Sequence, residues 1–583
     1  MTDEKIIIYQ VLPRLFSNRC ASCVPNGTYE QNGSGKLNDF TPKVLNEIKK
    51  LGANYIWYTG VIEHATKTDY SRYGIRPDNK YVVKGEAGSP YAIKDYYDID
   101  PDLAENPLER MHEFEALVAR THEAGLKVVL DFVPNHVARQ YHSDAAPQGV
   151  EDLGAHDNKE MHFSPSNNFY YIPRQAFTPQ FYIGEGDDRY FEYPAKATGN
   201  DCFGAFPNEN DWYETVKLNY GVDYMGGHRL CFDPIPDTWH KMLDILLFWC
   251  GKGIDAFRCD MAHMVPVEFW GWAISRVKES YPQVLFIAEI YDQGLYRLYL
   301  EKGKFDYLYD KVGLYDKLRG VLCHQVSAAQ LTYCWQAVDG IGGHMLNFLE
   351  NHDEQRFASP FFAGDADKAI PALAVATLMS TGPMMIYFGQ ELGERGDDAE
   401  GFSGHDGRTT IFDYWSVPTV RQWYDGGRCS IAKLTPQQKR LRNLYKTILN
   451  IGRHEKAVSQ GSFFDLMYVN GENPHLNPHR HYTFLRKYGR ELLLVAVNFD
   501  SRPAQVAINL PGHAFDTMKI VAGQYEATEL ISGEKETKTI SPDTPFDCTL
   551  PAYGAVVWKM ELKNFSQRNI EKMKKDKSEA KRS

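Results

Sequence analysis

Carboxylic acids follow three short apolar segments of this sequence, at the point where each segment would end. Asp260 follows the letters GIDAFRC, Glu289 follows LFIA, and Asp353 follows FLENH. Two carboxylates held about 5–5.5 Å apart are the equipment of retaining glycoside hydrolysis, in which one attacks and the other protonates the leaving oxygen. If the segments before Asp260 and Glu289 are neighbouring strands, we expect these two acids to face each other across such a gap.

A guanidinium is placed to separate the acidities of this pair. Arg258 precedes Asp260 by two residues, so on a strand its side chain points to the same side. A charge-assisted hydrogen bond from Arg258 would hold Asp260 ionised. Any single acid at a strand end is more often a helix N-cap or a surface group. A fourth apolar segment also ends in polar residues, DFVPNH at 131–136. Because four segments share this pattern, the catalytic interpretation is favoured over four separate surface groups.

Eight short apolar segments, separated by helix-like stretches, are available to position these residues. Apolar side chains recur at helical spacing over 42–51, 109–124 and 237–250. Eight strands that alternate with helices predict a TIM (β/α)8 barrel, an α/β fold whose active site lies at the C-terminal ends of its strands. The predicted strands are 6–12, 54–58, 127–133, 254–257, 284–288, 305–308, 345–349 and 384–388.

Two regions depart from this alternation. More than a hundred residues separate the strands near 130 and 256, which is too many for one crossover, so we expect a subdomain inserted after strand 3. After about residue 455, β-rich runs between Gly, Pro and Asp turns predict a C-terminal antiparallel β-sandwich. The predicted organisation is a first barrel part at 1–136, an inserted domain at 137–226, a second barrel part at 227–454, the β-sandwich at 455–562 and a basic, disordered tail at 563–583.

Composition narrows the class of protein. The chain has 583 residues, 43% apolar and 24% charged, with a formal net charge of −12, which argues against a nucleic-acid partner. The ten cysteines are scattered, and the single C-x-x-C at Cys20 and Cys23 has no second pair at zinc-site spacing. Neither a secretory signal nor an apolar run approaching ~18 residues is apparent, so we expect a cytoplasmic protein without a membrane partner.

With these residues the sequence resembles the α-amylase superfamily, glycoside hydrolase family 13, from about residue 5 to 562. The four short segments that identify the family occur in the right order: DFVPNH (131–136), GIDAFRCD (253–260), FIAEI (286–290) and FLENHD (348–353). The resemblance implies that Asp260 is the nucleophile, Glu289 the acid/base and Asp353 the acid that stabilises the transition state. The residues that it implies for substrate contacts are His136, Arg258, His352 and Tyr91.

The resemblance also raises one cofactor and leaves some roles open. In this family the residue at Asn135 often binds calcium, with further ligands from the inserted domain; a structural asparagine at a strand end is the alternative. The catalytic chemistry itself requires no cofactor. Tyr91 follows Gly88-Ser89-Pro90, where many relatives have Tyr-His-Gly, so its contact with a sugar is an open expectation. Aromatic residues of the insertion are either sugar platforms or core: Tyr170, Tyr171, Trp212 and Tyr220.

The implied function is retaining hydrolysis of α-1,4-glucosidic bonds in maltodextrin, starch or glycogen, with an α-glucan oligosaccharide or polysaccharide as the partner. A 4-α-glucanotransferase would use the same acids, because a sugar hydroxyl then replaces water in the second step. A non-catalytic carbohydrate-binding relative is disfavoured, since all three acids are present.

Overall fold

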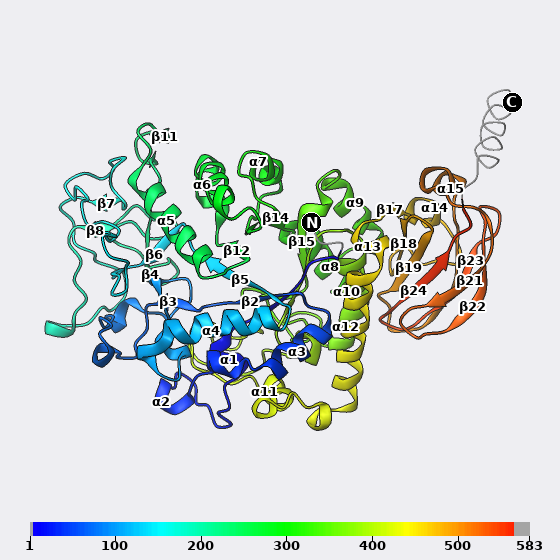
Figure 1. Ribbon diagram of the computed structural model, residues 1–583, viewed down its shortest axis with the longest axis horizontal. Coiled ribbons are helices and arrows are strands. Elements are labelled where there is room, and N and C mark those ends of the chain that lie inside the picture. The colour runs from blue at the N-terminus through cyan, green and yellow to red at the C-terminus, as the bar shows by residue number, and fades with distance from the viewer. Residues whose placement is uncertain (1–3, 565–583) are drawn as a thin grey trace.

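Eight parallel strands close into a barrel in the computed structural model, which describes residues 4–564 (Figure 1). All eight predicted strands are present, with boundaries that move by two residues or fewer at the catalytic strands. In their order around the barrel they are β1 (Ile7–Val11), β2 (Tyr55–Tyr58), β5 (Lys127–Phe132), β12 (Ala256–Cys259), β13 (Leu285–Ala288), β14 (Tyr307–Tyr309), β15 (Met345–Phe348) and β16 (Met384–Tyr387), which pairs with β1 again.

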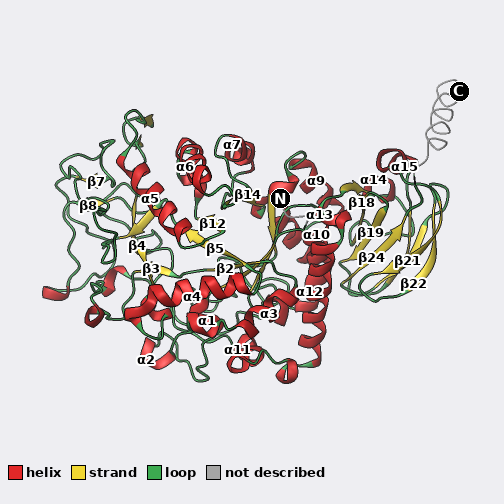
Figure 2. Cartoon of the chain, viewed as in Figure 1, coloured by secondary structure: helices red, strands yellow, loops and turns green. Residues whose placement is uncertain are grey.

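Helices cover the outside of the barrel, and most of them turn one apolar face inward (Figure 2). The helix over Pro42–Leu51 is capped by the Thr41 side chain, which accepts from the Val44 backbone N–H, and it buries Leu45 and Ile48 against the strands. The helices are α1 (Pro13–Phe16), α2 (Tyr29–Asn32), α3 (Pro42–Leu51), α4 (Arg110–Glu123), α5 (Asp237–Gly251), α6 (Val267–Ser280), α7 (Tyr296–Glu301), α8 (Asp316–Leu322), α9 (Leu331–Ala337), α10 (Ala369–Leu378), α11 (Pro418–Tyr424), α12 (Pro436–His454), α13 (Lys456–Ser459), α14 (Met467–Asn470) and α15 (Gly512–Met518).

Two long connections extend from the C-terminal ends of the strands. After β2, the antiparallel pair β3 (Ile62–His64) and β4 (Ile93–Ile99) forms a small sheet that the sequence did not predict. After β5 comes the predicted insertion, which has short strands, much loop and a small apolar core of its own. It holds the antiparallel pairs β6 (His136–Ala138) with β9 (Thr215–Lys217), β7 (Tyr171–Ile172) with β8 (Ala195–Lys196), and β10 (Val222–Asp223) with β11 (Arg229–Leu230).

The chain after α12 forms antiparallel β-structure, as predicted. It lies at the opposite end of the molecule's long axis from the insertion (Figure 1). One sheet has the order β17 (Ser462–Asp465), β18 (His481–Tyr488), β19 (Glu491–Asn498), β24 (Gly554–Glu561), β21 (Gly523–Glu529) and β22 (Lys535–Ile540), and the second pairs β20 (Ala504–Ile508) with β23 (Phe546–Leu550). The predicted disordered tail falls, from residue 565 on, outside the described residues.

Candidate active site

The three predicted catalytic acids lie together at the C-terminal ends of the barrel strands. Asp260 follows β12 directly, Glu289 follows β13 directly, and Asp353 lies five residues after β15. They line a cavity of about 360 Å³. Asp260 and Glu289 are 6% and 2% exposed, whereas the side chain of Asp353 is 43% exposed. The cavity is lined by Lys84, Ser89, Tyr91, His136, Trp212, Glu214, Thr215, Asp260, Met261, Glu289, Tyr291, His352, Asp353, Ile411 and Phe412.

One guanidinium contacts two of these acids. Arg258 Nη1 lies 2.7 Å from Asp260 Oδ1, and Arg258 Nη2 lies 2.8 Å from Glu289 Oε1. Burial alone would lower the pKa of Arg258, but Glu289 and the other acidic groups around it raise that pKa well above its ordinary value. Arg258 is therefore a permanent cation that holds both carboxyl groups at the mouth of the barrel.

The acidities of the three carboxyl groups are set by different partners. Burial raises the pKa of Asp260 and of Glu289, and Arg258 opposes that rise in both. Arg258 donates the predicted hydrogen bond to Asp260, whereas its contact with Glu289 is an ion pair without a hydrogen bond. Asp353 does differ: burial would raise its pKa, but the His352 imidazole, with Nε2 3.1 Å from Asp353 Oδ2, contributes most to lowering it to about 2.

A fourth buried acid, Asp131, supports the site from the end of β5. The Trp57 indole donates to Asp131 Oδ2 at 2.8 Å, and Arg258 Nη1 lies 3.4 Å from Asp131 Oδ1. The Tyr91 hydroxyl donates to Asp131 Oδ1 at 3.4 Å, and the Tyr91 ring stacks on His352 with 5.0 Å between ring centroids. Asp131 opens the DFVPNH segment, so its position could have been read from the sequence, although its contact with Arg258 could not.

His136 and Trp212 form another wall of the cavity, with ring centroids 5.3 Å apart. Burial, and then the Lys217 ammonium, lowers the pKa of His136 to about 3, so its imidazole is neutral. Trp212 is the one of the four candidate aromatic residues that lines this cavity; the other three, Tyr170, Tyr171 and Tyr220, are buried in the core.

The surroundings of Asn135 do not fit a calcium ion. Asn135 Oδ1 accepts from Lys217 Nζ at 2.5 Å, and Asn135 Nδ2 donates to the Gly199 carbonyl at 2.8 Å. Lys217 Nζ also lies 2.7 Å from Asp201 Oδ1. A calcium ion at Asn135 would have to displace this ammonium from its oxygen ligands, because two cations cannot share them. The Asn135 oxygen, the predicted calcium ligand, is here bound to a lysine.

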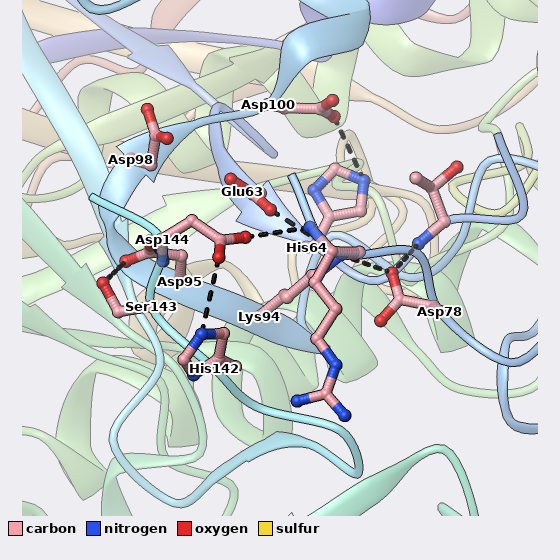
Figure 3. A network of polar contacts seen from close by, with 12 residues as sticks. Glu63, His64, Asp78, Lys94, Asp95, Asp98, Asp100, His142, Ser143 and Asp144 are labelled. Atoms are coloured by element: carbon pink, nitrogen blue, oxygen red, sulfur yellow. Dashed lines mark hydrogen bonds and ion pairs between the residues drawn. The ribbon is translucent and has the colours of Figure 1, made fainter. Parts of the chain in front are cut away.

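A second acidic group lies between β3 and β4, where Glu63, Asp95 and Asp98 each place one carboxylate oxygen within 4.8 Å of the others (Figure 3). Asp98 is bound by the Arg110 guanidinium. Asp95 accepts from the Ser143 hydroxyl and from backbone N–H groups, including those of 97, 144 and 145. The lone pairs of both aspartates are therefore already used and only the Glu63 oxygens are left without hydrogen bonds from the described residues, so the group is not a prepared metal site.

Several cavity residues were missed by the sequence analysis. Lys84 and Glu214 form an ion pair of 3.0 Å on the cavity wall, and Ile411 and Phe412 reach it from the loop after β16. These residues lie in long loops, where no periodicity or motif marks them. Tyr291 could have been found, since it lies only two residues after Glu289; its hydroxyl donates to Glu289 Oε1 at 2.6 Å.

Among the described residues, no helix is both long and apolar enough to cross a membrane.

Comparison with known proteins agrees with this architecture. The curated relatives include Alpha-amylase 3 of Dictyoglomus thermophilum, 24% identical over 392 residues that cover 64% of this chain and 68% of the relative. A cyclomaltodextrinase of Thermoanaerobacter pseudethanolicus is 21% identical over 519 residues, covering 86% of this chain and 71% of the relative. The solved alpha-amylase of Geobacillus thermoleovorans, complexed with acarbose, shares the fold with a TM-score of 0.60 at 19% identity, covering 96% of this chain and 99% of that one. The family model for the alpha amylase catalytic domain matches residues 10–413, which is more than half of the sequence, so the chain belongs to the alpha-amylase family, glycoside hydrolase family 13.

Proposed function

We propose that the protein hydrolyses α-1,4-glucosidic bonds of maltodextrin, starch or glycogen with retention of anomeric configuration. The observation that carries the proposal is the pair Asp260 and Glu289, whose carboxylate oxygens contact the two ends of the Arg258 guanidinium at the mouth of the barrel. Two carboxyl groups that contact the same guanidinium lie near each other, which suits the short separation that retaining enzymes need.

In the first step Glu289 donates its proton to the glycosidic oxygen while Asp260 attacks the anomeric carbon. The bond from that carbon to the glycosidic oxygen breaks, and a covalent glycosyl-enzyme forms on Asp260. In the second step Glu289 removes a proton from water, the hydroxyl attacks the same carbon, and Asp260 leaves as a carboxylate. Asp353, whose pKa of about 2 keeps it ionised, binds sugar hydroxyls and stabilises the positive charge of the transition state.

The substrate class is supported by the cavity and by the relatives. A cavity of about 360 Å³ with Tyr91, Trp212 and Phe412 on its walls suits a short stretch of sugar rings, which stack on aromatic faces. His136, His352 and Arg258 supply polar contacts there. The relatives include an alpha-amylase and a cyclomaltodextrinase, and the solved alpha-amylase is in complex with acarbose. An α-glucan oligosaccharide is thus the partner that we propose.

The test is a time course on maltoheptaose, with products sized by mass spectrometry and the Asp260→Asn variant as the blank. Shorter oligosaccharides alone would support hydrolysis. Chains longer than seven units would instead move the assignment to a 4-α-glucanotransferase, which uses the same acids with a sugar hydroxyl in place of water. Absence of any product from maltoheptaose, soluble starch and glycogen would contradict the proposed function.

A further inference from the structure

Glu289 must change its protonation state twice in each catalytic cycle, so each of its polar contacts matters for both states. Arg258 Nη2 lies 2.8 Å from Oε1, and the Met261 backbone N–H donates to Oε2 at 2.8 Å. A guanidinium and a backbone N–H can donate but never accept. These two partners therefore stabilise the ionised carboxylate and offer no acceptor for the proton of the neutral acid.

Tyr291 is the remaining partner of Glu289 among the described residues, and it differs in kind. Its hydroxyl lies 2.6 Å from Glu289 Oε1, and its ring lines the cavity. A phenol is both a donor and an acceptor. Burial, and then the charge on Glu289, raises the pKa of Tyr291 well above its ordinary value, so the hydroxyl keeps its proton throughout the working pH range.

We propose that Tyr291 is a positioning residue for the acid/base, whose hydroxyl donates to Glu289 when the carboxyl is ionised and accepts from it when the carboxyl is protonated. In the neutral state the carboxyl proton on Oε1 points to Tyr291 Oη until the glycosidic oxygen takes it as the glycosidic bond breaks. After Glu289 has taken a proton from water, the same contact holds that proton for the next cycle. The proposal rests on the proposed function, because it requires Glu289 to exchange protons with substrate and water.

The other two acids lack such a reversible partner among the described residues. Asp260 contacts the Arg258 guanidinium. Asp353 contacts His352 Nε2, which carries a proton because the Gln10 amide donates to His352 Nδ1 at 2.9 Å. The charged and titratable groups around Glu289 and Tyr291 are otherwise Asp260 and Arg258 from β12 and its end, His263 from the turn that follows, and Asp353 after β15. The Tyr291 hydroxyl, which can either donate or accept, thus contacts Glu289, the one carboxyl group whose proposed role requires it to lose and regain a proton.

The test is the Tyr291→Phe variant, which removes one oxygen and keeps the ring. Tyr291→Phe removes a partner from both states of Glu289, but the hydrogen bond to the charged carboxylate is the stronger of the two, so its loss costs the ionised form more. The pKa of Glu289 should therefore rise, and the alkaline limb of kcat/KM should move up by roughly one pH unit. For maltotriose we expect kcat/KM at the optimum to fall about tenfold through kcat, with KM changed less than about twofold. For 2,4-dinitrophenyl α-maltoside, whose leaving group needs no proton, kcat/KM should stay within about twofold of the wild-type value.

The matched control is Tyr299→Phe. The Tyr299 hydroxyl is also buried and donates to the Val265 carbonyl at 2.9 Å, but it does not line the cavity. Tyr299→Phe should keep the wild-type pH profile and the wild-type kcat/KM on both substrates. An unchanged alkaline limb in Tyr291→Phe, or an equal loss on both substrates, would overturn the proposal and leave Tyr291 a structural residue. Failure of the proposed function is a separate result, since the wild-type enzyme would then cleave none of the α-glucans.

Discussion

At the scale of single residues, the site is a set of carboxyl groups distinguished by what each one contacts. Asp260 and Glu289 share Arg258, and burial raises the pKa of each. Asp353 is set apart by His352, whose pKa rises in turn because of Asp353 even though burial opposes that rise. Asp353 is therefore ionised at nearly any working pH. The protonation of Asp260 and Glu289 instead depends on Arg258 and on the bound substrate.

The Asp260→Asn variant should fold normally and lose activity on maltoheptaose by about a thousandfold or more, because an amide cannot form the glycosyl-enzyme. The measurement is kcat/KM, with the melting temperature as the check on folding. Asp255→Asn is the matched control: it lies on the same strand segment at the other end of the barrel, where its carboxylate accepts from the Val128 backbone N–H at 2.8 Å. Equal activity of Asp260→Asn and wild type would remove Asp260 from the proposed mechanism.

At the scale of elements, the junction of β6, β9 and the barrel depends on an ammonium where the family often uses a metal. Lys217 on β9 links Asn135, at the end of β5, to Asp201 in the insertion. Its site is buried, and burial lowers the pKa of Lys217 while Asp201 opposes that change. A covalently attached cation cannot be removed by a chelator, so this junction should not depend on the calcium concentration.

We therefore expect EDTA and added Ca²⁺ to leave both the melting temperature and kcat/KM unchanged. Lys217→Met should instead lower the free energy of unfolding by about 1–2 kcal/mol, because it leaves the buried Asn135 oxygen without its donor, whereas the Asp201 carboxylate is 38% exposed and can be solvated. Lys80→Met is the contrast, since both ends of its 2.8 Å ion pair with Asp188 are exposed and its loss should leave the melting temperature nearly unchanged. A fall in melting temperature with EDTA, reversed by Ca²⁺, would contradict this prediction.

The β3–β4 pair makes a prediction about pH, because Glu63 on β3 is buried and neither of its oxygens has a hydrogen-bond partner among the described residues. Burial raises the pKa of Glu63 well above its usual value, and the Lys94 ammonium, 3.9 Å away, only partly opposes that rise. The folded state therefore keeps a proton that the unfolded state loses. Stability from this group is unaffected at acid pH and falls as the pH rises above the unfolded pKa.

Glu63→Gln removes the ionisable group at nearly constant volume. Relative to wild type, the variant should gain stability with rising pH, by about 1–3 kcal/mol at pH 8 compared with pH 4.5. Urea unfolding at the two pH values measures this difference. Glu123→Gln, an exposed change on α4, should show none of it. Destabilisation of Glu63→Gln that grows between pH 4.5 and pH 8 would mean instead that an ionised Glu63 stabilises the fold through Lys94.

At the scale of the whole molecule, the barrel could be predicted because its strands are short apolar runs that each end in polar residues, a pattern that survives in the sequence alone. The β3–β4 pair was missed because the strand KDYYDI is buried although half polar, its acids being satisfied by Arg110 and by backbone N–H groups that only the fold brings near. Likewise, Arg258 was expected beside Asp260, but its contact with Glu289 depends on the register of two strands, Arg258 opposite Ile287. The local pattern of apolar and polar residues therefore predicts which side chains lie at the C-terminal ends of the barrel strands. Which of those side chains contact one another depends on how strands distant in the sequence pair.

The joint between the barrel and the C-terminal β-structure depends on a buried guanidinium. Arg486 on β18 donates to the carbonyls of Met379, just after α10, and of Val458 on α13, at 3.0 and 2.7 Å, and also to those of Ala457 and Gly461. Helix α10 is buried along its whole length and packs against α12 on one side and β19 and β24 on the other. Arg486 thus donates hydrogen bonds to backbone carbonyls where α10, α13 and β18 meet, at a place where no strand pairing supplies such donors.

Arg486→Met should leave those carbonyls unpaired in a buried place, which costs about 1–3 kcal/mol for each group that water cannot reach. We expect a lower melting temperature and faster proteolysis near residues 455–461, with kcat/KM on maltotriose unchanged at temperatures where the variant is folded, because the cavity lies at the other end of the strands. Arg490→Met, whose guanidinium is half exposed beside Glu561, is the control and should change none of these values. Wild-type stability in Arg486→Met would show that apolar packing around α10 alone holds the two parts together.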